Sequence, residues 1–494
     1  MTKHLDIDTK AMRAKILDLA IQGKLTDQRE EDGNARDLLK EIQAEKEKLI
    51  KEKKIKKEKP LPEITEEEKP FEIPKNWMWA RWGTLSISIK YGYNTSAQKD
   101  GKIKMVRISD IQNNQVNWDS VPFCNIPKEE ITQYLLRKND ILFARTGGTV
   151  GKSYLVSEVP ENVVYAGYLI RTRYSENLSP QYLKYFMESD LYWSQLKKGT
   201  TTTAQPNCNA KTLGKMVLPL PPLAEQKRIA DKVSALFAQL DAVDKAYEEY
   251  RELQQNMKTK LLDLAIQGKL TDQRAEDGDA RDLFNDIQKE KQRLIAEKKI
   301  KKEKPLPEIE ADEIPFEIPT NWMWARLGDI VSKTIKRGKS PKYSITGDVL
   351  VFAQKCNTKP GRINLELAKK LDLSTLKKYP EEEFMLSGDI VINSTGNGTM
   401  GRVGFFRDKD NPYNLKIVPD SHVTTIRVLH DLIDSQYIFY FLKKLQPKLE
   451  SSGDGSTNQK ELKATIIASI CIPLPPLDEQ KRIVAKLDEL LPLL

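Results

Sequence analysis

An internal repeat constrains this chain more than any other feature of its sequence. Residues 15–64 and 260–309 agree at about 40 of 50 aligned positions, with one constant offset and no gap. The likeness continues through PFEIPKNWMWARWG (70–83) and PFEIPTNWMWARLG (315–328) and then fades. A chain that repeats itself in this way is expected to fold as two similar units built on one plan.

The repeat alternates with blocks whose sequences differ. The shared sequence returns as LPLPPLAEQKRIADKV (218–233) and IPLPPLDEQKRIVAKL (472–487). Each block therefore lies between shared connectors. We expect five segments: an N-terminal connector half (1–69), a first globular block, block one (70–217), a central connector (218–314), a second globular block, block two (315–471), and a C-terminal connector half (472–494).

The two ends of the chain complement each other. Leu494 aligns with Leu240 of the central connector, and Met1 aligns with Ala246. Joined together, the ends would rebuild a second central connector. We therefore expect a pseudo-twofold, circularly closed molecule in which the N-terminal helix docks on the C-terminal one.

The connectors are predicted to be helical. From Ile229 onward, apolar residues recur at steps of four and three through Val233, Leu236 and Leu240, which is typical of a coiled-coil seam. A second helix is expected after Asn34 or Asp279 and should run to Pro60 or Pro305. The lysine run 51–59 is then interpreted as a solvated helix face rather than as a DNA contact, which stays the alternative. The blocks mix strand-like and helix-like runs, so the fold class is mixed α/β, with two globular domains joined by long antiparallel coiled-coil helices.

Composition excludes several classes of protein. The 494 residues carry a net charge of +9 and contain no apolar run long enough for a membrane span, and the N-terminus lacks an apolar signal core. Four dispersed cysteines and three histidines offer no metal or disulfide framework. We expect a cytoplasmic protein without a metal site, and the charge suits a polyanionic partner.

The stretch ARTGGTVGKS (144–153) resembles a phosphate-binding P-loop but departs from it. Thr146 stands where that motif needs glycine, and block two replaces Lys152 with Arg402. A tight glycine turn between two strands explains both copies. A nucleotide-dependent enzyme built on this stretch stays an alternative that ATP binding would support.

Three polar loops in each block carry residues suited to DNA. Lysine and arginine can hold phosphate, and asparagine, glutamine, tyrosine and hydroxyl side chains can contact bases. The block-one candidates are Lys90, Tyr91, Tyr93, Asn94 and Lys99 after the first strand, Arg145, Thr146 and Lys152 at the glycine turn, and Thr201, Thr202 and Gln205 in the closing loop. The block-two candidates are Lys333, Lys336, Arg337, Lys339, Lys342 and Tyr343, then Asn393, Ser394, Thr395 and Arg402, then Thr457 and Gln459.

The order of these motifs resembles the specificity subunit of type I restriction–modification systems. The resemblance covers nearly the whole chain and is carried by NWMWARWG and NWMWARLG, by NDILFARTGGTVGKS and GDIVINSTGNGTMGR, by LPLPPLAEQKRI and IPLPPLDEQKRI, and by AIQGKLT in both connectors.

This resemblance implies a non-catalytic subunit that binds double-stranded DNA. Two target-recognition domains would each read half of an asymmetric bipartite site, with residues 84–217 specifying one half and 329–470 the other. The connectors would act as a ruler and dock two methyltransferase subunits, and an endonuclease and translocase subunit would join them. S-adenosylmethionine, ATP and Mg²⁺ would bind those partners and not this chain. A coiled-coil scaffold without sequence preference is a third possibility, which uniform binding to unrelated duplexes would support.

Overall fold

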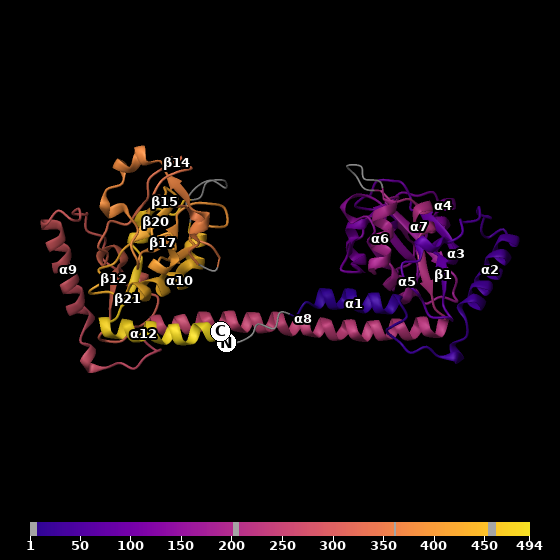
Figure 1. Cartoon of the computed structure of the whole chain (residues 1–494), viewed down its shortest axis with the longest axis horizontal. Helices are drawn as coiled ribbons and strands as arrows, with labels where there is room; N and C mark the ends of the chain where they lie inside the picture. Colours follow the sequence, from indigo (N-terminus) through magenta and orange to yellow (C-terminus); the bar gives the residue numbers. More distant parts are fainter. Residues whose placement is uncertain (1–6, 201–206, 360–361, 453–460) are drawn as a thin grey trace. The chain divides into compact units, whose positions relative to one another are not determined.

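The computed structural model describes residues 7–200, 207–359, 362–452 and 461–494. Its chain divides into two compact units, His4–Glu248 and Glu249–Leu494. We call them the first and the second unit and describe each by itself. Helix α8 (Leu223–Ile266) contributes its first part to the first unit and its last part to the second (Figure 1). The first unit holds block one and the second unit holds block two.

Within the described residues, the first unit contains four sheets and several short helices. Its four-stranded sheet has the order β2-β10-β7-β8, and in its three-stranded sheet β3 pairs with β6 and, in parallel, with β9. The elements of the first unit are α1 (Thr9–Ile21), α2 (Ala35–Lys51), β1 (Met78–Arg81), α3 (Trp82–Leu85), β2 (Ser86–Tyr91), β3 (Ile103–Val106), β4 (Ile111–Gln112), β5 (Gln115–Val116), β6 (Phe123–Cys124), α4 (Lys128–Tyr134), β7 (Ile141–Ala144), β8 (Ser153–Leu155), β9 (Val163–Tyr165), β10 (Leu169–Tyr174), α5 (Pro180–Phe186), α6 (Asp190–Gly199), α7 (Ala210–Lys215) and β11 (Val217–Leu220).

Block two repeats this plan with different details. Its first four-stranded sheet has the order β13-β20-β17-β18, and its second has the order β14-β16-β15-β19 with β15 and β19 parallel. The elements of the second unit are α9 (Ala280–Ala296), β12 (Met323–Arg326), β13 (Lys336–Arg337), β14 (Tyr343–Ser344), β15 (Val349–Phe352), β16 (Lys369–Leu371), β17 (Ile390–Asn393), β18 (Val403–Phe405), β19 (Lys416–Pro419), β20 (Val423–Ile426), α10 (Ser435–Ser451), α11 (Ala464–Ala468), β21 (Cys471–Leu474) and α12 (Leu477–Leu490).

Strand register aligns the two blocks residue by residue. In block one, Ile170 of β10 pairs with both Tyr91 of β2 and Phe143 of β7. In block two, Thr424 of β20 pairs in the same way with Arg337 of β13 and Ile392 of β17. The central strands β7 and β17 are buried along their whole length, as the apolar runs 141–144 and 390–392 predict. The mixed α/β fold class with two globular domains is therefore confirmed.

The helical connector differs from expectation at one point. α2 ends at Lys51 and α9 at Ala296, well before the prolines that we expected to stop them. The next residues turn the chain out of the helix, because Lys53 (φ +55°) and Lys298 (φ +58°) adopt the left-handed conformation. The lysine run 51–59 is therefore not a helix face, and that interpretation was wrong.

The helix that pairs with α8 in the first unit is α1, which runs antiparallel to it (Figure 1). Thr9 Oγ1 donates to Asp244 Oδ1 at 2.7 Å, and further along α1 the Arg13 guanidinium donates to Asp241 at 2.8 Å. In the second unit, α12 lies beside the last part of α8 (Figure 1), and Ile483 and Leu487 share a core with Ala265. The second connector helix α2 instead packs on its own block, where Lys46 Nζ donates to the carbonyl of Gly83 at 3.0 Å.

The expected seam of α8 is buried at its start and open in its middle. Ile229, Val233 and Leu240 are buried in the first unit, whereas Tyr250 and Leu253 are exposed. The predicted docking of the N-terminal helix on the C-terminal helix stays a prediction, because α1 and α12 belong to different units and each unit is described by itself. Within the described ranges, no helix combines the length and the apolar character that a membrane crossing requires.

A buried carboxylate joins connector and block in the first unit. Glu225 accepts hydrogen bonds from Trp77 Nε1 at 2.7 Å, Gln28 Nε2 at 2.6 Å and Thr26 Oγ1 at 3.2 Å. Burial raises the pKa of Glu225, and the three donors oppose that shift. Three separate stretches of the repeat meet at this carboxylate, which gives the repeat a packing function.

The second unit contains the same arrangement. Glu479 accepts from Trp322 Nε1 at 2.8 Å, Gln273 Nε2 at 2.6 Å and Thr271 Oγ1 at 3.2 Å. Burial again raises the pKa of the carboxyl group. We call the groups around Glu225 and Glu479 the two joints.

Next to each joint, the connector binds main-chain atoms of the block. Gln226 Oε1 accepts from the Ser179 N–H at 3.0 Å, and Gln480 Oε1 accepts from the Asp434 N–H at 2.9 Å. The residue type in the block differs, but the contact does not. The same holds for Lys46 with the Thr84 carbonyl (3.3 Å) and Lys291 with the Asp329 carbonyl (3.2 Å).

Candidate nucleic-acid interface

Three segments of block one that the sequence analysis identified meet at one end of its four-stranded sheet, where the strands β2 and β7 end. The Arg145 guanidinium, at the end of β7, lies 4.6 Å from the centre of the Tyr91 ring at the end of β2. Thr146 forms a β-bridge with Asn207, and the Arg145 carbonyl accepts from the Cys208 N–H at 2.9 Å. The loop after the first strand, the glycine turn and the closing loop are therefore neighbours.

Block two brings the same three segments together. Thr395 forms a β-bridge with Glu461, and the Ser394 carbonyl accepts from the Leu462 N–H at 2.8 Å. Arg337, which takes the place of Tyr91, forms a 3.1 Å ion pair with Glu461. We call these two clusters the loop edges. Their main-chain geometry is shared, whereas their side chains differ.

A close backbone approach fixes the first segment of each loop edge. The Gly92 N–H donates to the Leu169 carbonyl at 3.0 Å, and a Cβ at Gly92 would lie 2.2 Å from the Ala166 carbonyl oxygen. A Cβ at Gly338 would lie 2.1 Å from the Pro419 carbonyl oxygen. No side chain fits at either position, so glycine is required there.

The glycine turns connect antiparallel strands and do not form phosphate loops. Phe143 of β7 pairs with Ser153 of β8 across the turn, and β17 pairs with β18 in the same way. Gly147 (φ +74°) and Gly151 (φ +91°) supply the left-handed residues of the turn. A P-loop needs a helix after its last glycine, whose N-terminus holds the phosphate. Here a strand follows, which confirms the glycine-turn prediction.

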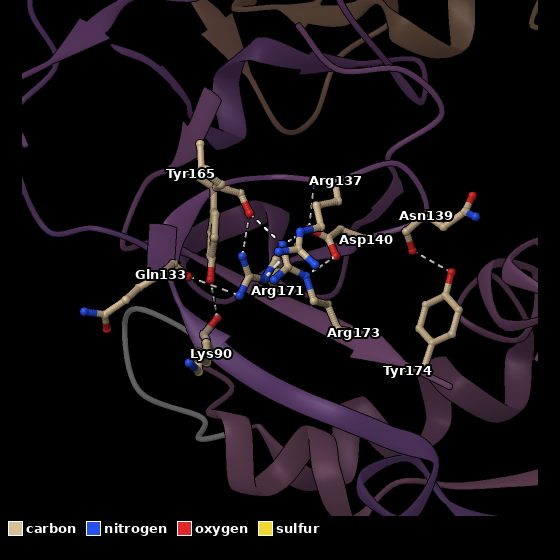
Figure 2. Close-up of polar contacts among 10 residues, drawn as sticks. Lys90, Gln133, Arg137, Asn139, Asp140, Tyr165, Arg171, Arg173 and Tyr174 are labelled. Atoms are coloured by element: carbon tan, nitrogen blue, oxygen red, sulfur yellow. Dashed lines mark hydrogen bonds and ion pairs between the residues drawn. The ribbon is translucent and has the colours of Figure 1, made fainter. Parts of the chain in front are cut away.

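A buried ion pair anchors the strand that leads to each loop edge. Asp140 accepts from Arg173 at 2.7 and 3.0 Å and from the Arg137 N–H at 2.9 Å, and Figure 2 shows these groups converging on the start of β7. In block two Asp389 accepts from Arg427, at 2.7 Å through two nitrogens, and from the Leu386 N–H at 2.9 Å. A bidentate pair of this kind fixes the geometry of the strand.

Beside this shared pair the two blocks carry different charges. Arg171 is buried in block one, its guanidinium 5.1 Å from the Tyr165 ring centre (Figure 2), and burial lowers the pKa of Arg171. Burial raises the pKa of Tyr165 to about 12. Strand register places Thr425 at the position of Arg171 in block two.

In block two a buried glutamate gathers three of the predicted DNA-binding lysines. Glu383 lies 2.6 Å from Lys336 and 3.8 Å from both Lys333 and Lys339. Burial would raise the pKa of Glu383, but the hydrogen bond from Lys336 and the neighbouring lysine charges outweigh burial, so that its pKa is lowered. All three lysines are therefore close to a carboxylate of their own block, and Lys333 is itself buried, whereas Lys336 is exposed.

Three further candidates are buried and hold the fold. Arg402 donates to the Asn357 carbonyl at 2.8 Å, and Asn357 donates to Asn393 Oδ1 at 3.2 Å. Ser394 shares a 2.6 Å hydrogen bond with Thr424. With Lys333 these residues have structural roles in this fold, and none of them presents its side chain at the surface.

The remaining candidates lie at or near the surface. Lys90, Tyr91, Asn94, Lys99, Lys152, Lys336, Lys342 and Tyr343 are exposed, and Tyr93, Arg145, Thr146, Arg337, Lys339 and Thr395 are partly buried. Lys342 is paired with Asp372 at 2.8 Å. Thr201, Thr202, Gln205, Thr457 and Gln459 lie outside the described residues.

Sequence reasoning missed two residues of the loop edges. The Tyr168 carbonyl accepts from the Arg145 N–H at 3.1 Å, and the His422 carbonyl accepts from the Ser394 N–H at 2.8 Å, so these residues are equivalent. Tyr168 is 64% exposed, and His422 is exposed with its Nδ1 2.7 Å from Thr395 Oγ1. Tyr168 directly precedes the buried strand β10, and His422 directly precedes the buried strand β20. A polar or aromatic residue immediately before an apolar run was the sequence signal that could have identified them.

The family described as type I restriction modification DNA specificity domain matches residues 89–249 and 319–492. The chain therefore belongs to this family, and it carries two such domains. The first match covers the four-stranded sheet of block one from Ile89 of β2 onward, and the second covers both four-stranded sheets of block two. Each match also covers one loop edge.

Individual relatives agree with this assignment. The chain is 28% identical to the type I restriction enzyme EcoAI specificity subunit of Escherichia coli, over 98% of this chain and 89% of that protein. It is 27% identical to the EcoEI specificity subunit of Escherichia coli, over 97% and 88%. A chain from a solved structure of complex assembly and conformational transition of the type I R-M system shares the fold, with TM-score 0.51, 21% identity and coverage of 85% and 91%. The expected class, a type I specificity subunit with two target-recognition domains, is confirmed.

Proposed function

We propose that each block reads one half of an asymmetric bipartite DNA sequence through its loop edge. The observation that carries this proposal is the pair of loop edges themselves. Their main-chain contacts are the same, but Tyr91, Arg145 and Tyr168 in block one are replaced by Arg337, Ser394 and His422 in block two. A shared frame with different side chains suits two half-sites with different base sequences.

The proposal divides the chain by task. Residues 84–217 specify one half-site and residues 329–470 the other, within the domains 70–217 and 315–471. The accessible candidates of the loop edges contact bases and nearby phosphates. The chain acts in the cytoplasm, has no catalytic group of its own and takes its chemistry from partner subunits.

The connectors 1–69, 218–314 and 472–494 set the spacing and dock the partners. The 44 residues of α8 form a helix about 66 Å long at about 1.5 Å per residue, which suits a ruler. Two nearly identical connector surfaces suit two copies of one methyltransferase subunit, each docking in the same way. An endonuclease and translocase subunit completes the complex. S-adenosylmethionine, ATP and Mg²⁺ bind those partners.

A methylome tests the proposal. The chain is co-expressed with the methyltransferase encoded beside it in a host without DNA methylation, and modified bases are mapped by single-molecule sequencing. We expect one motif with two defined halves around a gap of fixed length. Methylation of a short continuous motif, independent of this chain, would refute the proposal.

A block exchange tests the division of labour. Replacing residues 329–470 with the corresponding block of a relative should change one half of the methylated motif and leave the other half and the gap intact. A change in both halves would contradict reading by separate blocks.

A further inference from the structure

Two identical lysine-rich segments lie outside the loop edges. Lys53–Lys59 and Lys298–Lys304 both read KKIKKEK, with five lysines and one glutamate. All ten lysines are exposed. We call these segments the lysine strips. They follow α2 and α9, and neither strip lies within a helix or a strand.

The helices before the strips show how far the two copies of the repeat have diverged nearby. α2 and α9, which come directly before them, have diverged at 7 of their 17 aligned positions: Leu39/Phe284, Lys40/Asn285, Glu41/Asp286, Ala44/Lys289, Glu47/Gln292, Lys48/Arg293 and Lys51/Ala296. Exposed lysines on α2 have thus been replaced freely. From Glu52 to Ile64, by contrast, every residue is the same in Glu297–Ile309. α2 and α9 have therefore diverged more than the segments that follow them, which a recent duplication with uniform divergence does not explain.

Backbone geometry gives a second, independent indication. Lys53 and Lys298 occupy the left-handed conformation that ends a helix, where glycine is favoured and a side chain costs roughly 1 kcal/mol. The Lys53 N–H donates to the Ile50 carbonyl at 3.0 Å and the Lys54 N–H to the Leu49 carbonyl at 2.9 Å. Both copies nevertheless have lysine at this position, so the positive charge is kept although the backbone conformation there favours glycine.

The strips are held in place at both ends. On one side, α2 is attached to its block through Lys46. On the other, the buried Arg81 guanidinium donates to the Pro62 and Glu63 carbonyls at 2.7 and 2.8 Å. Arg326 makes the same two contacts with Pro307 and Glu308 in the second unit, at 3.1 and 2.7 Å. A strip anchored on both sides presents its lysines at a defined place on the unit.

We propose that the lysine strips hold the phosphate backbone of the DNA, independently of base sequence and in the same way at both half-sites. The proposal rests on the proposed function, because it assumes that both units lie on DNA. The two half-sites differ in their bases but have the same phosphate backbone. Identical lysine strips therefore suit contacts with the backbone, whereas the different loop edges suit contacts with the bases. Lysine is typical of phosphate contacts and depleted in protein–protein interfaces, which favours DNA over a docked subunit.

The position of Lys56 supports this assignment. Burial lowers the pKa of Lys90, and the charges of Arg171, Arg173 and Lys56 lower it further, so Lys56 lies within electrostatic range of Lys90. Lys90 precedes the Tyr91 of the loop edge by one residue. The charge of Lys56 therefore adds to the positive charge around Lys90 in the first unit.

The test removes three charges from one strip in the full chain, assembled with its methyltransferase subunits. The variant K56Q/K57Q/K59Q is compared with K40Q/K48Q/K51Q, which removes three exposed lysines from α2 of the same unit. Binding to a duplex with the mapped site and to an unrelated duplex is measured at several salt concentrations. Each phosphate contact adds roughly 0.9 to the slope of log K against log salt.

We expect the strip variant to lower the slope by about two to three on both duplexes, and the α2 variant to leave it unchanged. The variant K301Q/K302Q/K304Q should behave as the first strip variant does. A slope equal to that of the α2 variant would overturn the proposal. The proposal would also be overturned if the salt slope stayed unchanged while size-exclusion chromatography showed that the methyltransferase subunits were lost. The strips would then be docking surfaces for those subunits. If methylation still follows a bipartite motif, either result refutes the strips alone and leaves the proposed function standing.

Discussion

The indole nitrogen of Trp77 donates a 2.7 Å hydrogen bond to the buried carboxylate of Glu225, at the point where the connector meets block one. Trp322 and Glu479 make the same bond at 2.8 Å in the second unit. Trp77 and Trp322 lie in the shared opening sequence of the blocks, and Glu225 and Glu479 lie in the connectors, so each unit is joined by residues of the repeat.

The first prediction concerns this bond. The substitution Trp77→Phe keeps an aromatic ring and removes one of the three donors to Glu225. We expect it to lower the free energy of unfolding by about 1–3 kcal/mol, the usual cost of an unsatisfied buried polar group. Urea denaturation of the full chain measures the loss. The control is Trp79→Phe, at a neighbouring indole whose ring is tilted against Phe71 with ring centres 5.2 Å apart. Equal losses in both variants would contradict a special role for Trp77.

The second prediction concerns pH. Hydrogen bonds from Arg326 hold the pKa of Glu313 at about 2, below its ordinary 4.5. A carboxyl group whose pKa is lowered by folding stabilises the fold above its unfolded pKa, and this contribution disappears as pH falls through the folded value. Glu313→Gln should therefore be less stable than the parent at pH 7, and the difference should shrink between pH 4.5 and 2. Thermal unfolding of both proteins across that range measures the difference. A stability difference that stays constant from pH 4.5 to 2 would contradict the prediction.

The third prediction concerns Tyr168. Its side chain is exposed, and its carbonyl accepts from the Arg145 N–H in the loop edge of block one. If this edge reads bases, Tyr168→Ala should weaken binding by about 1–3 kcal/mol and relax discrimination in one half-site only. Competition with duplexes altered in one half or the other measures this. Tyr413→Ala removes an exposed ring of block two outside the loop edge and should leave both halves unaffected. Equal loss of discrimination in both halves would argue against a role in reading.

The fourth prediction concerns Gly92. A methyl group there would lie 2.2 Å from a carbonyl oxygen, so Gly92→Ala must displace the backbone between β2 and β9. We expect a loss of about 1–3 kcal/mol or more in the free energy of unfolding. Gly148→Ala is the matched control in the same block, since its Cβ would meet nothing within 4 Å. Unfolding of both variants without DNA decides the matter, and similar stabilities would contradict the close approach.

Much of the fold could be predicted from the repeat and from local patterns. The two blocks, the strand at Met78–Arg81 and the glycine turn after β7 all follow from contiguous residues. The early end of α2 could not be predicted. Lys53 adopts the left-handed conformation that ends the helix, but that conformation is usually recognised in a sequence by a glycine, and none is present here. A lysine-rich helix and a lysine-rich loop after a helix look alike in sequence.

The candidate site was predicted less completely, for a physical reason. The three loops were identified correctly as segments, but which side chains reach the surface depends on residues far away in sequence. Arg402 is held inside the fold by its hydrogen bond to the Asn357 carbonyl. Tyr168 lies at the loop edge because the register of β10 against β7 places the start of β10 beside the end of β7. Neither contact leaves a local trace in the sequence.

The connectors bind the blocks through amide and carbonyl groups, which every amino acid carries. Gln226 meets an N–H of serine and Gln480 an N–H of aspartate, yet both contacts have the same geometry. Natural selection can therefore rewrite the surface of a block without disturbing its attachment. Mutational tolerance should be distributed accordingly, with new DNA specificities arising at little structural risk in the blocks while the connector residues that hold them are kept.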